Sequence, residues 1–304
     1  MANLDLIVRA LRTQCPGLEI LEHEPMRAHC SFRIGGPARA LVRPASAEET
    51  AAVCRIVRDG GAQPLIIGNG TNLLITDGAL ERIVVQMGDN MAAVTQPDTT
   101  HLSAGAGIPL ARLAQAALGC GLAGLEFAHG IPGSLGGAVS MNAGAYGGEM
   151  KDVLTTVQYL TAEGEVKESA ASELDLRYRH SIFEENGGCI LSAQFALTPG
   201  EPEAIRAKMD ELMAKRLDKQ PLDKPSAGST FKRPVGAFAA ALIDQCGLRG
   251  YRHGGAAVSE KHCGFVVNLG GASCADVLAL CEEVRTIVKE KTGYDLEKEI
   301  RVVR

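Results

Sequence analysis

The chain has no tryptophan, and aromatic residues make up only 4% of its 304 residues. So few aromatic side chains weigh against a surface that stacks nucleic-acid bases. The 31 lysines and arginines form no basic run and the net charge is −5, so no nucleic-acid partner is expected. No apolar run approaches the length of a membrane span, and the N-terminus lacks an apolar signal-peptide core. Membrane insertion is therefore not expected, and no feature indicates an obligate protein partner.

The nine cysteines include no CxxC pair, which argues against a zinc ribbon or a redox dithiol. An odd number of cysteines also fits poorly with a disulfide framework. We expect buried, reduced thiols in a cytoplasmic protein, and no metal site.

The length and a hydrophobic content of 46% predict two or three domains with a large core. Strand and helix patterns interleave without a regular βαβα order, which favours the α+β class over a doubly wound sheet. Helices are predicted at the N-terminus, from Ser46 to Gly60, from Pro109 to Gly119, and over Glu201–Arg216, Gly236–Cys246 and Ser273–Lys291. Strands are predicted within Cys30–Arg43 (two, around a turn), Pro64–Ile75, Arg82–Gln86, His101–Gly107, Val153–Leu160 paired with Glu165–Glu168, Cys189–Thr198, Gly264–Leu269 and the last ten residues.

Two glycine-rich segments stand out, the first ribbon (Ile66–Asp77) and the second ribbon (Gly124–Gly148). Glycine is favoured where the backbone needs φ > 0 or must approach a ligand closely. In the first ribbon, residues 68–72 offer consecutive backbone N–H groups and carry only small or polar side chains. Such a segment is typical of an anion-binding nest for a pyrophosphate. Together the ribbons predict a site for a large phosphorylated cofactor.

The familiar nucleotide and hydrolase motifs are incomplete or missing. Gly105-Ala106-Gly107 follows a strand, but Leu110 stands where the dinucleotide fingerprint requires glycine. The sequence contains neither GxxxxGK[ST] nor a GxSxG elbow. These gaps argue against a Rossmann site, a P-loop and a serine hydrolase.

Three further segments hold candidate chemical residues: Tyr178–Ser181, Ser226–Ser229 and Glu299. Taken singly, each is more typical of a turn, a cap or a solvated charge. Their spacing alone does not assemble them into a site.

In combination these segments resemble the UDP-N-acetylenolpyruvoylglucosamine reductases, flavoenzymes of peptidoglycan-precursor synthesis, over nearly the whole chain. The short gap between Arg179 and Ser229 resembles the compact (type II) subgroup, and Lys298 replaces a proline usual in the family. The matching segments are SFRIGGPA (31–38), IIGNGTNLLITD (66–77), AGAGIPL (104–110), GIPGSLGGAVSMNAGAYGGEM (130–150), YRHSIF (178–183), PSAGSTFKRP (225–234), GGAAVSEKHCGFVVN (254–268) and LEKEIRVV (296–303).

The resemblance implies an FAD-binding fold of the vanillyl-alcohol-oxidase type, with two FAD subdomains (1–86 and 87–200), a substrate-binding domain (201–293) and a last strand (294–304) that returns to the second subdomain. It implies that NADPH reduces a non-covalently bound FAD, which then reduces the enolpyruvyl group of a UDP-sugar to give UDP-N-acetylmuramate. By family correspondence, Ser229 protonates the α-carbon while Arg179 and Glu299 stabilise charge on the substrate carboxylate.

The resemblance also implies binding residues. Those for FAD are Gly68, Asn69, Gly70, Thr71, Asn72, Gly130, Ile131, Gly133, Ser134, Gly137, Ala138, Asn142, Gly144, Ile190 and Arg33. Those for the substrate are Tyr178, Arg216, Lys219 and Lys232. Two alternatives are a different flavoprotein on the same fold and a non-catalytic nucleotide-binding or scaffold protein.

Overall fold

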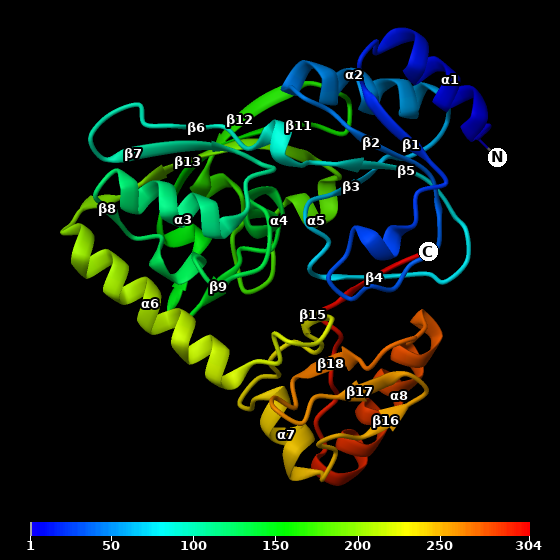
Figure 1. Ribbon diagram of the computed structural model, residues 1–304, viewed down its shortest axis with the longest axis vertical. Coiled ribbons are helices and arrows are strands. Elements are labelled where there is room, and N and C mark those ends of the chain that lie inside the picture. Colours follow the sequence, from blue (N-terminus) through cyan, green and yellow to red (C-terminus); the bar gives the residue numbers. More distant parts are fainter. Residues whose placement is uncertain (1) are drawn as a thin grey trace. The chain divides into compact units, whose positions relative to one another are not determined.

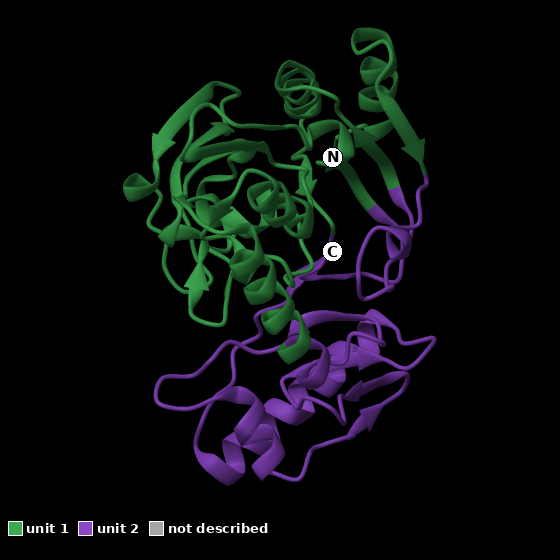
Figure 2. Ribbon diagram, turned by 60° about the vertical axis from the view of Figure 1, so that its left-hand side comes forward, with its two compact units in different colours: residues 1–22, 39–69, 81–215 green, residues 23–38, 70–80, 216–304 purple. Residues whose placement is uncertain are grey.

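The structure is a computed structural model that describes residues 2–304 and divides into two units (Figure 2). Unit 1 contains the residues up to 22 together with 39–69 and 81–215, and unit 2 contains 23–38, 70–80 and 216–304. Met1, which belongs to the predicted first helix and first domain, lies outside the described residues. Two units are a coarser division than the three predicted domains, whose boundaries stay a prediction.

A four-stranded sheet in unit 1 carries the first ribbon at its edge. Its order is β1-β2-β5-β3, with β1 (Glu19–Glu22), β2 (Ala38–Arg43), β5 (Leu80–Gln86) and β3 (Leu65–Ile67). Helices α1 (Leu4–Gln14) and α2 (Ala47–Asp59) pack together beside it (Figure 1). Ser46 begins α2 as predicted, because its side chain accepts a hydrogen bond from the Glu49 N–H at 3.1 Å.

A five-stranded antiparallel sheet forms the other half of unit 1. Its order is β12-β11-β13-β7-β6, with β12 (Val166–Ala170), β11 (Leu154–Leu160), β13 (Cys189–Ala196), β7 (His101–Gly105) and β6 (Val94–Thr95). Helix α4 (Leu135–Ser140) contacts β13 and β7, and α3 (Leu110–Gly119) lies nearby (Figure 1). One continuous hydrophobic core joins both sheets of unit 1 and the apolar face of α6 (Pro202–Lys219).

Unit 2 is built on an antiparallel sheet of order β15-β18-β17-β16, with β15 (Ser226–Ser229), β18 (Phe265–Asn268), β17 (Ala256–Val258) and β16 (Arg252–His253). Helix α8 (Cys274–Thr292) lies against β16 and β17, and it contacts α7 (Ala239–Gln245) (Figure 1). The C-terminal strand β19 (Arg301–Val303) pairs in parallel with β4 (Leu73–Ile75) of the first ribbon. The end of the chain therefore returns to the first ribbon, within the predicted first subdomain (1–86), and the prediction that it returns to the second subdomain (87–200) was wrong.

Short elements complete the fold. The remaining strands and helix are β8 (Leu122–Ala123), β9 (Gly144–Ala145), β10 (Gly148–Glu149), β14 (Thr198–Pro199) and α5 (Phe183–Asn186). Single 3₁₀ turns cover Met26–Ala28, Asp89–Met91, Glu126–Ala128, Met150–Asp152 and Ala171–Glu173.

Two strand predictions were wrong in detail. Only β2 forms within Cys30–Arg43; the preceding segment is irregular because side chains hold it, with Ser31 Oγ donating to the Ser226 carbonyl at 2.6 Å. The predicted strand Pro64–Ile75 is split into β3 and β4, which belong to different sheets. Local alternation does not reveal such a break, since both pieces are apolar.

All nine cysteines are free thiols, and eight of them are buried as expected. Cys120, which is exposed, is the exception. Burial raises the pKa of Cys54 to about 11 and that of Cys281 to about 12. These thiols are therefore protonated and unreactive at neutral pH.

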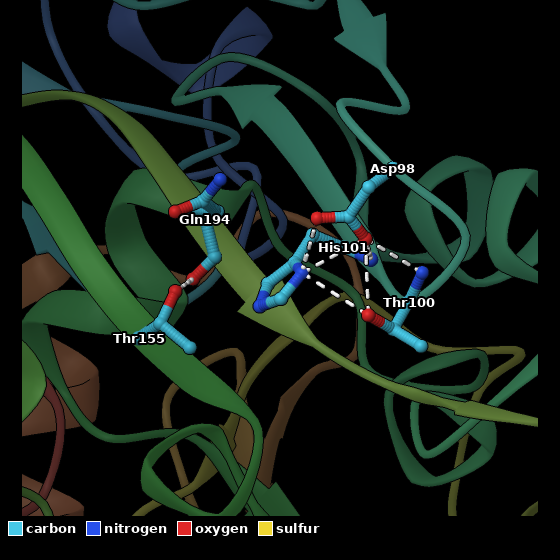
Figure 3. A network of polar contacts seen from close by, with 5 residues as sticks. All are labelled: Asp98, Thr100, His101, Thr155 and Gln194. Carbon is cyan, nitrogen blue, oxygen red and sulfur yellow. Dashed lines mark hydrogen bonds and ion pairs between the residues drawn. The ribbon is translucent and has the colours of Figure 1, made fainter.

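Asp98 closes the turn that leads into β7 (Figure 3). One carboxylate oxygen accepts from the N–H groups of Thr100 at 2.8 Å and His101 at 3.0 Å. The Thr100 N–H, and after it the His101 ring, lower the pKa of Asp98 to about 2. On the adjoining strands, the register of β11 and β13 shifts at Thr155, whose hydroxyl donates to the Gln194 carbonyl at 3.0 Å.

We expect Asp98→Asn to lower the melting temperature at neutral pH, because it removes the charged partner of four groups: the backbone N–H groups of Thr100 and His101, the Thr100 hydroxyl and the His101 ring. The carboxyl pKa is lower in the folded chain than its ordinary value of 3.8, so its stabilisation is present above that value and is lost as the pH falls toward about 2. Thermal unfolding should therefore show a constant difference between variant and parent from about pH 7 to about pH 5, and a shrinking one below about pH 4. A difference that does not change with pH would contradict this role.

Candidate functional site

The second ribbon is held by main-chain hydrogen bonds to the segment before α3. The Leu110 N–H donates to the Gly133 carbonyl at 2.9 Å, and the Leu135 N–H donates to the Ile108 carbonyl at 2.9 Å. The Gly136 N–H donates to the Ala106 carbonyl at 2.8 Å. The sequence AGAGIPL, which fails as a dinucleotide fingerprint, thus serves as the support for this ribbon.

In unit 1 the first and second ribbons approach each other at Gly68 and Ser134. A Cβ atom on Gly68 would overlap Ser134 Oγ, so a larger residue would require the Ser134 side chain to move. Ser134 is buried, and its hydroxyl has no hydrogen-bond partner anywhere in residues 2–304. A buried, unsatisfied hydroxyl beside a cradle of glycines fits a ligand rich in acceptor oxygens, and the pyrophosphate and ribityl groups of FAD are of that kind.

Asn142, another predicted cofactor residue, is buried with φ +42° and uses its amide within the protein. Its Nδ2 donates to Glu149 Oε2 at 2.6 Å and to the Arg177 carbonyl at 3.2 Å. Its Oδ1 accepts from the Lys151 N–H at 2.9 Å. The side chain therefore fixes the second ribbon to the loop that carries Arg179.

Arg179 stands in a tight turn closed by two hydrogen bonds between the backbones of Arg177 and His180, at 3.1 and 3.2 Å. It is the third residue of that turn and has φ +54°, a conformation in which glycine is usual. Its guanidinium lies 5.2 Å from the ring centre of Tyr178. The turn is anchored on α4, because Ser181 Oγ donates to the Ser140 carbonyl at 2.6 Å.

In unit 2, the backbone segments that carry Ser229 and Glu299 are joined through Thr230, the residue that follows Ser229. The Thr230 carbonyl accepts from the Glu299 N–H at 2.8 Å, while its own N–H donates to the Gly264 carbonyl at 2.8 Å. Its hydroxyl accepts from the Val266 N–H at 2.9 Å. Thr230 is buried, so this junction is shielded from water.

Asn72 of the first ribbon is bonded to the same terminal segment. Its carbonyl accepts from the Arg301 N–H at 2.9 Å, and its side chain donates to the Glu299 carbonyl at 3.2 Å. Glu299 precedes β19 rather than lying in it, which corrects the expectation that it belongs to the terminal strand. Residues 70–77 of the first ribbon therefore lie in the same unit as Ser229 and Glu299.

The other predicted residues are distributed as follows. Gly130, Ile131, Gly133, Gly137 and Ala138 line the second ribbon and the start of α4; Gly144 lies in β9; and Ile190 is buried in β13. In unit 2, Gly70 and Thr71 continue the first ribbon, and Arg33 is exposed with φ +55°. Arg216 and Lys219 stand in the last turn of α6, and Lys232 forms an ion pair with Glu297 at 2.6 Å.

Sequence reasoning missed two positioning residues in unit 2. Thr230 is one, since nothing in a threonine between Ser229 and Phe231 signals its three hydrogen bonds. Asp77 is the other: its carboxylate accepts from the N–H groups of Cys274 at 2.8 Å and Ala275 at 3.3 Å, at the first turn of α8. Such a cap from a distant segment leaves no local pattern.

Comparison with known proteins finds relatives along nearly the whole chain. The model described as FAD binding domain matches residues 38–170, and that of the UDP-N-acetylenolpyruvoylglucosamine reductase C-terminal domain matches residues 220–303. The reductase of that name from Agathobacter rectalis is 48% identical over 310 residues, covering 97% of this chain and 98% of the relative. The one from Clostridioides difficile is 45% identical, covering 100% and 99%. The crystal structure of the Thermus caldophilus reductase superposes with a TM-score of 0.79 and 34% identity, over 94% of this chain and 99% of that one.

The fold, the glycine cradle and the FAD-binding match define an FAD-dependent oxidoreductase. The chain belongs to the UDP-N-acetylenolpyruvoylglucosamine reductase family. The predicted family, the α+β FAD-binding fold, the FAD cofactor with NADPH as co-substrate and the reductase class are confirmed. Over residues 2–304, no helix is long and apolar enough to cross a membrane.

We expect Gly68→Ala to weaken FAD binding, because the added methyl group overlaps Ser134 Oγ and displaces the Ser134 side chain. Overpacking of this kind costs about 1–3 kcal/mol. Gly68→Ala/Ser134→Ala, which removes the hydroxyl, should recover part of the loss. Gly78→Ala is the matched control, since a Cβ there meets no atom of the described chain within 4 Å. Titration of apoprotein with FAD measures the effect, and equal affinities for all variants would contradict the cradle.

We expect Arg179→Gly and Arg179→Ala to lose activity equally, by about 10²-fold or more, because both remove the guanidinium. Glycine adopts φ +54° without strain, whereas alanine does not. The glycine variant should therefore be more stable than the alanine variant by about 1 kcal/mol. Urea unfolding and NADPH oxidation measure the two effects. Equal stability would show that the turn does not strain residue 179.

Proposed function

We propose that this chain reduces the enolpyruvyl group of UDP-N-acetyl-3-O-(1-carboxyvinyl)glucosamine to UDP-N-acetylmuramate, using NADPH, and that Ser229, Glu299 and Arg179 are its catalytic residues. The observation that supports this most directly is the hydrogen bond from the Glu299 N–H to Thr230, which holds Glu299 next to Ser229 and to the first ribbon. The relatives named above are reductases by name, and this chain matches them over nearly their full length. A cytoplasmic location stays a prediction.

Bound FAD, once reduced by NADPH, supplies the hydride that the β-carbon of the enolpyruvyl ether receives. An enol ether is rich in electrons, so it accepts hydride only if its carboxylate takes up the charge that develops. Arg179 carries a guanidinium group, which is positively charged in proteins, and its planar set of N–H donors is suited to stabilise that charge. Glu299, half-buried, supports the same carboxylate if it is protonated and donates a hydrogen bond.

Ser229 completes the reduction by giving its hydroxyl proton to the α-carbon, and solvent restores that proton afterwards. A hydroxyl is a weak acid, so it acts on a strongly basic enolate that forms after hydride arrives. Gly228, with φ +75°, precedes it and turns the end of β15. The Thr230 hydrogen bonds on the other side hold the backbone of Ser229 fixed.

The diphosphate of the substrate calls for cationic side chains, and we assign Arg216 and Lys219 to it. Both stand in the last turn of α6, where the chain enters unit 2. Lys232 already pairs with Glu297, so its contribution would require that ion pair to open. Tyr178, exposed beside Arg179, is suited to contact the sugar.

The two half-reactions test these roles. In Ser229→Ala the bound FAD should be reduced by NADPH at the parent rate, because flavin reduction does not involve proton transfer to the enolpyruvyl substrate. Reoxidation by the enolpyruvyl substrate should slow by about 10²–10⁴-fold, the range usual for a positioned acid. Stopped-flow absorbance of the flavin under anaerobic conditions measures both steps.

Ser226→Ala is the matched control, since Ser226 lies on the same strand and only its backbone carbonyl accepts the Ser31 hydrogen bond. That variant should behave like the parent in both half-reactions. Loss of both half-reactions in Ser229→Ala would remove Ser229 from the mechanism. Failure of the parent enzyme to be reoxidised by the substrate would overturn the proposed function itself.

A further inference from the structure

Strand β15 contains a β-bulge directly before Ser229. Ser226 pairs with Val267 and Ser229 pairs with Phe265, so β15 has one residue more than β18 between these two pairs. Gly228 lies in the bulge with φ +75°, the left-handed conformation that glycine favours. A bulge interrupts the ladder of hydrogen bonds and redirects the side chain that follows it. The direction of the Ser229 side chain therefore depends on how the two ends of the bulge are held.

One end of the bulge is held by Thr230, and the other end is held by a residue from a distant part of the chain. The Thr230 N–H donates to the Gly264 carbonyl at 2.8 Å. At the other end, the hydroxyl of half-buried Ser31 donates to the Ser226 carbonyl at 2.6 Å. A side chain nearly 200 residues away in the sequence thus fixes the strand that carries Ser229.

Ser31 is also bonded to the first ribbon. Its N–H donates to the Gly70 carbonyl at 3.2 Å. A Cβ atom on Gly70 would lie 2.2 Å from the His29 carbonyl oxygen, so the ribbon packs backbone against backbone on the residues just before Ser31. Within unit 2, Ser31 therefore contacts both the first ribbon and the strand of Ser229.

The segment that contains Ser31 is fixed by Asn268, which is buried at the end of β18. The Asn268 Nδ2 donates to the Phe32 carbonyl at 3.2 Å, and its Oδ1 accepts from the Gly270 N–H at 2.8 Å. Its own N–H donates to the Pro225 carbonyl at 2.9 Å, next to the start of β15. Ser31 is consequently held in place relative to the strand to which its hydroxyl is bonded.

We propose that Ser31 is a positioning residue for the reduction, because its hydroxyl fixes the bulge of β15 and so directs the Ser229 hydroxyl toward the α-carbon of the substrate. The Ser31 proton is committed to a backbone carbonyl, so Ser31 acts through Ser229 and not on the substrate itself. This inference rests on the proposed function, since it takes Ser229 as the proton donor.

Ser31→Ala removes the hydroxyl that holds the bulge. Reoxidation of reduced FAD by the enolpyruvyl substrate should slow by about 10- to 100-fold, because a small misplacement of a reacting group is enough for such a loss. Reduction by NADPH should keep the parent rate, and the FAD content per chain should be unchanged. Ser31→Thr keeps a hydroxyl and should stay within about threefold of the parent in both half-reactions. Anaerobic stopped-flow absorbance of the flavin measures these rates.

Thr292→Ala is the matched control in unit 2. It also removes a hydroxyl that donates to a backbone carbonyl, that of Val288 at 2.7 Å, but it does so at the end of α8. Both half-reactions should run at the parent rates in this variant. Ser31→Cys provides the test with a smaller change, since a thiol is a weaker donor, and its reoxidation rate should lie between those of Ser31→Ala and the parent.

The double variant Ser31→Ala/Ser229→Ala distinguishes positioning from a general structural role. Once the Ser229 hydroxyl is gone, there is no proton donor left to misplace, so the double variant should be reoxidised within about twofold of the rate of Ser229→Ala. A role in the fold alone would slow reoxidation by the same factor in both backgrounds, which would overturn the proposal.

Reoxidation at the parent rate in Ser31→Ala and Ser31→Cys would also overturn the proposal, as would a loss in Ser31→Thr as large as in Ser31→Ala. Reoxidation of Ser229→Ala at the parent rate would instead count against the role of Ser229 in the proposed function.

Discussion

The close approach of Gly68 to Ser134 is the constraint on which the cofactor site depends. Strand β3 ends at Ile67 and helix α4 begins at Leu135, so the end of a strand and the start of a helix meet at one place. A side chain at position 68 would require the Ser134 side chain to move. Glycine at this position lets the two ribbons lie close together.

The proposed chemistry depends on a second set of main-chain bonds. Ser229 and Glu299 are far apart in sequence, and Thr230 joins the two segments because its carbonyl accepts a hydrogen bond from the Glu299 N–H. Asn72 then links the same segment to the first ribbon. A change in the cofactor loop would therefore be transmitted to the proposed acid through backbone geometry, without any side chain of the active site being altered.

Features set by neighbouring residues could be predicted from the sequence. Ser46 and Ser273 begin helices where expected, and Gly293 ends α8 in a left-handed conformation, because caps act within one turn. The glycine ribbons could also be recognised, since so many glycines are concentrated in two short segments. The division of Pro64–Ile75 between two sheets could not, nor could the roles of Thr230 and Asp77. Their partners come from remote parts of the chain, and only the tertiary fold brings them together.

Backbone strain gives an independent reason to assign function to Arg179. A residue with φ > 0 and a Cβ costs about 1–2 kcal/mol relative to glycine, and glycine would satisfy the same turn. Asn142, also at positive φ, has three side-chain hydrogen bonds that offset this cost. In Arg179 the guanidinium stacks on Tyr178, which is itself exposed, and the turn is held from outside by Ser181. An arginine held at a backbone conformation usual for glycine is a feature that the catalytic role proposed for Arg179 would explain.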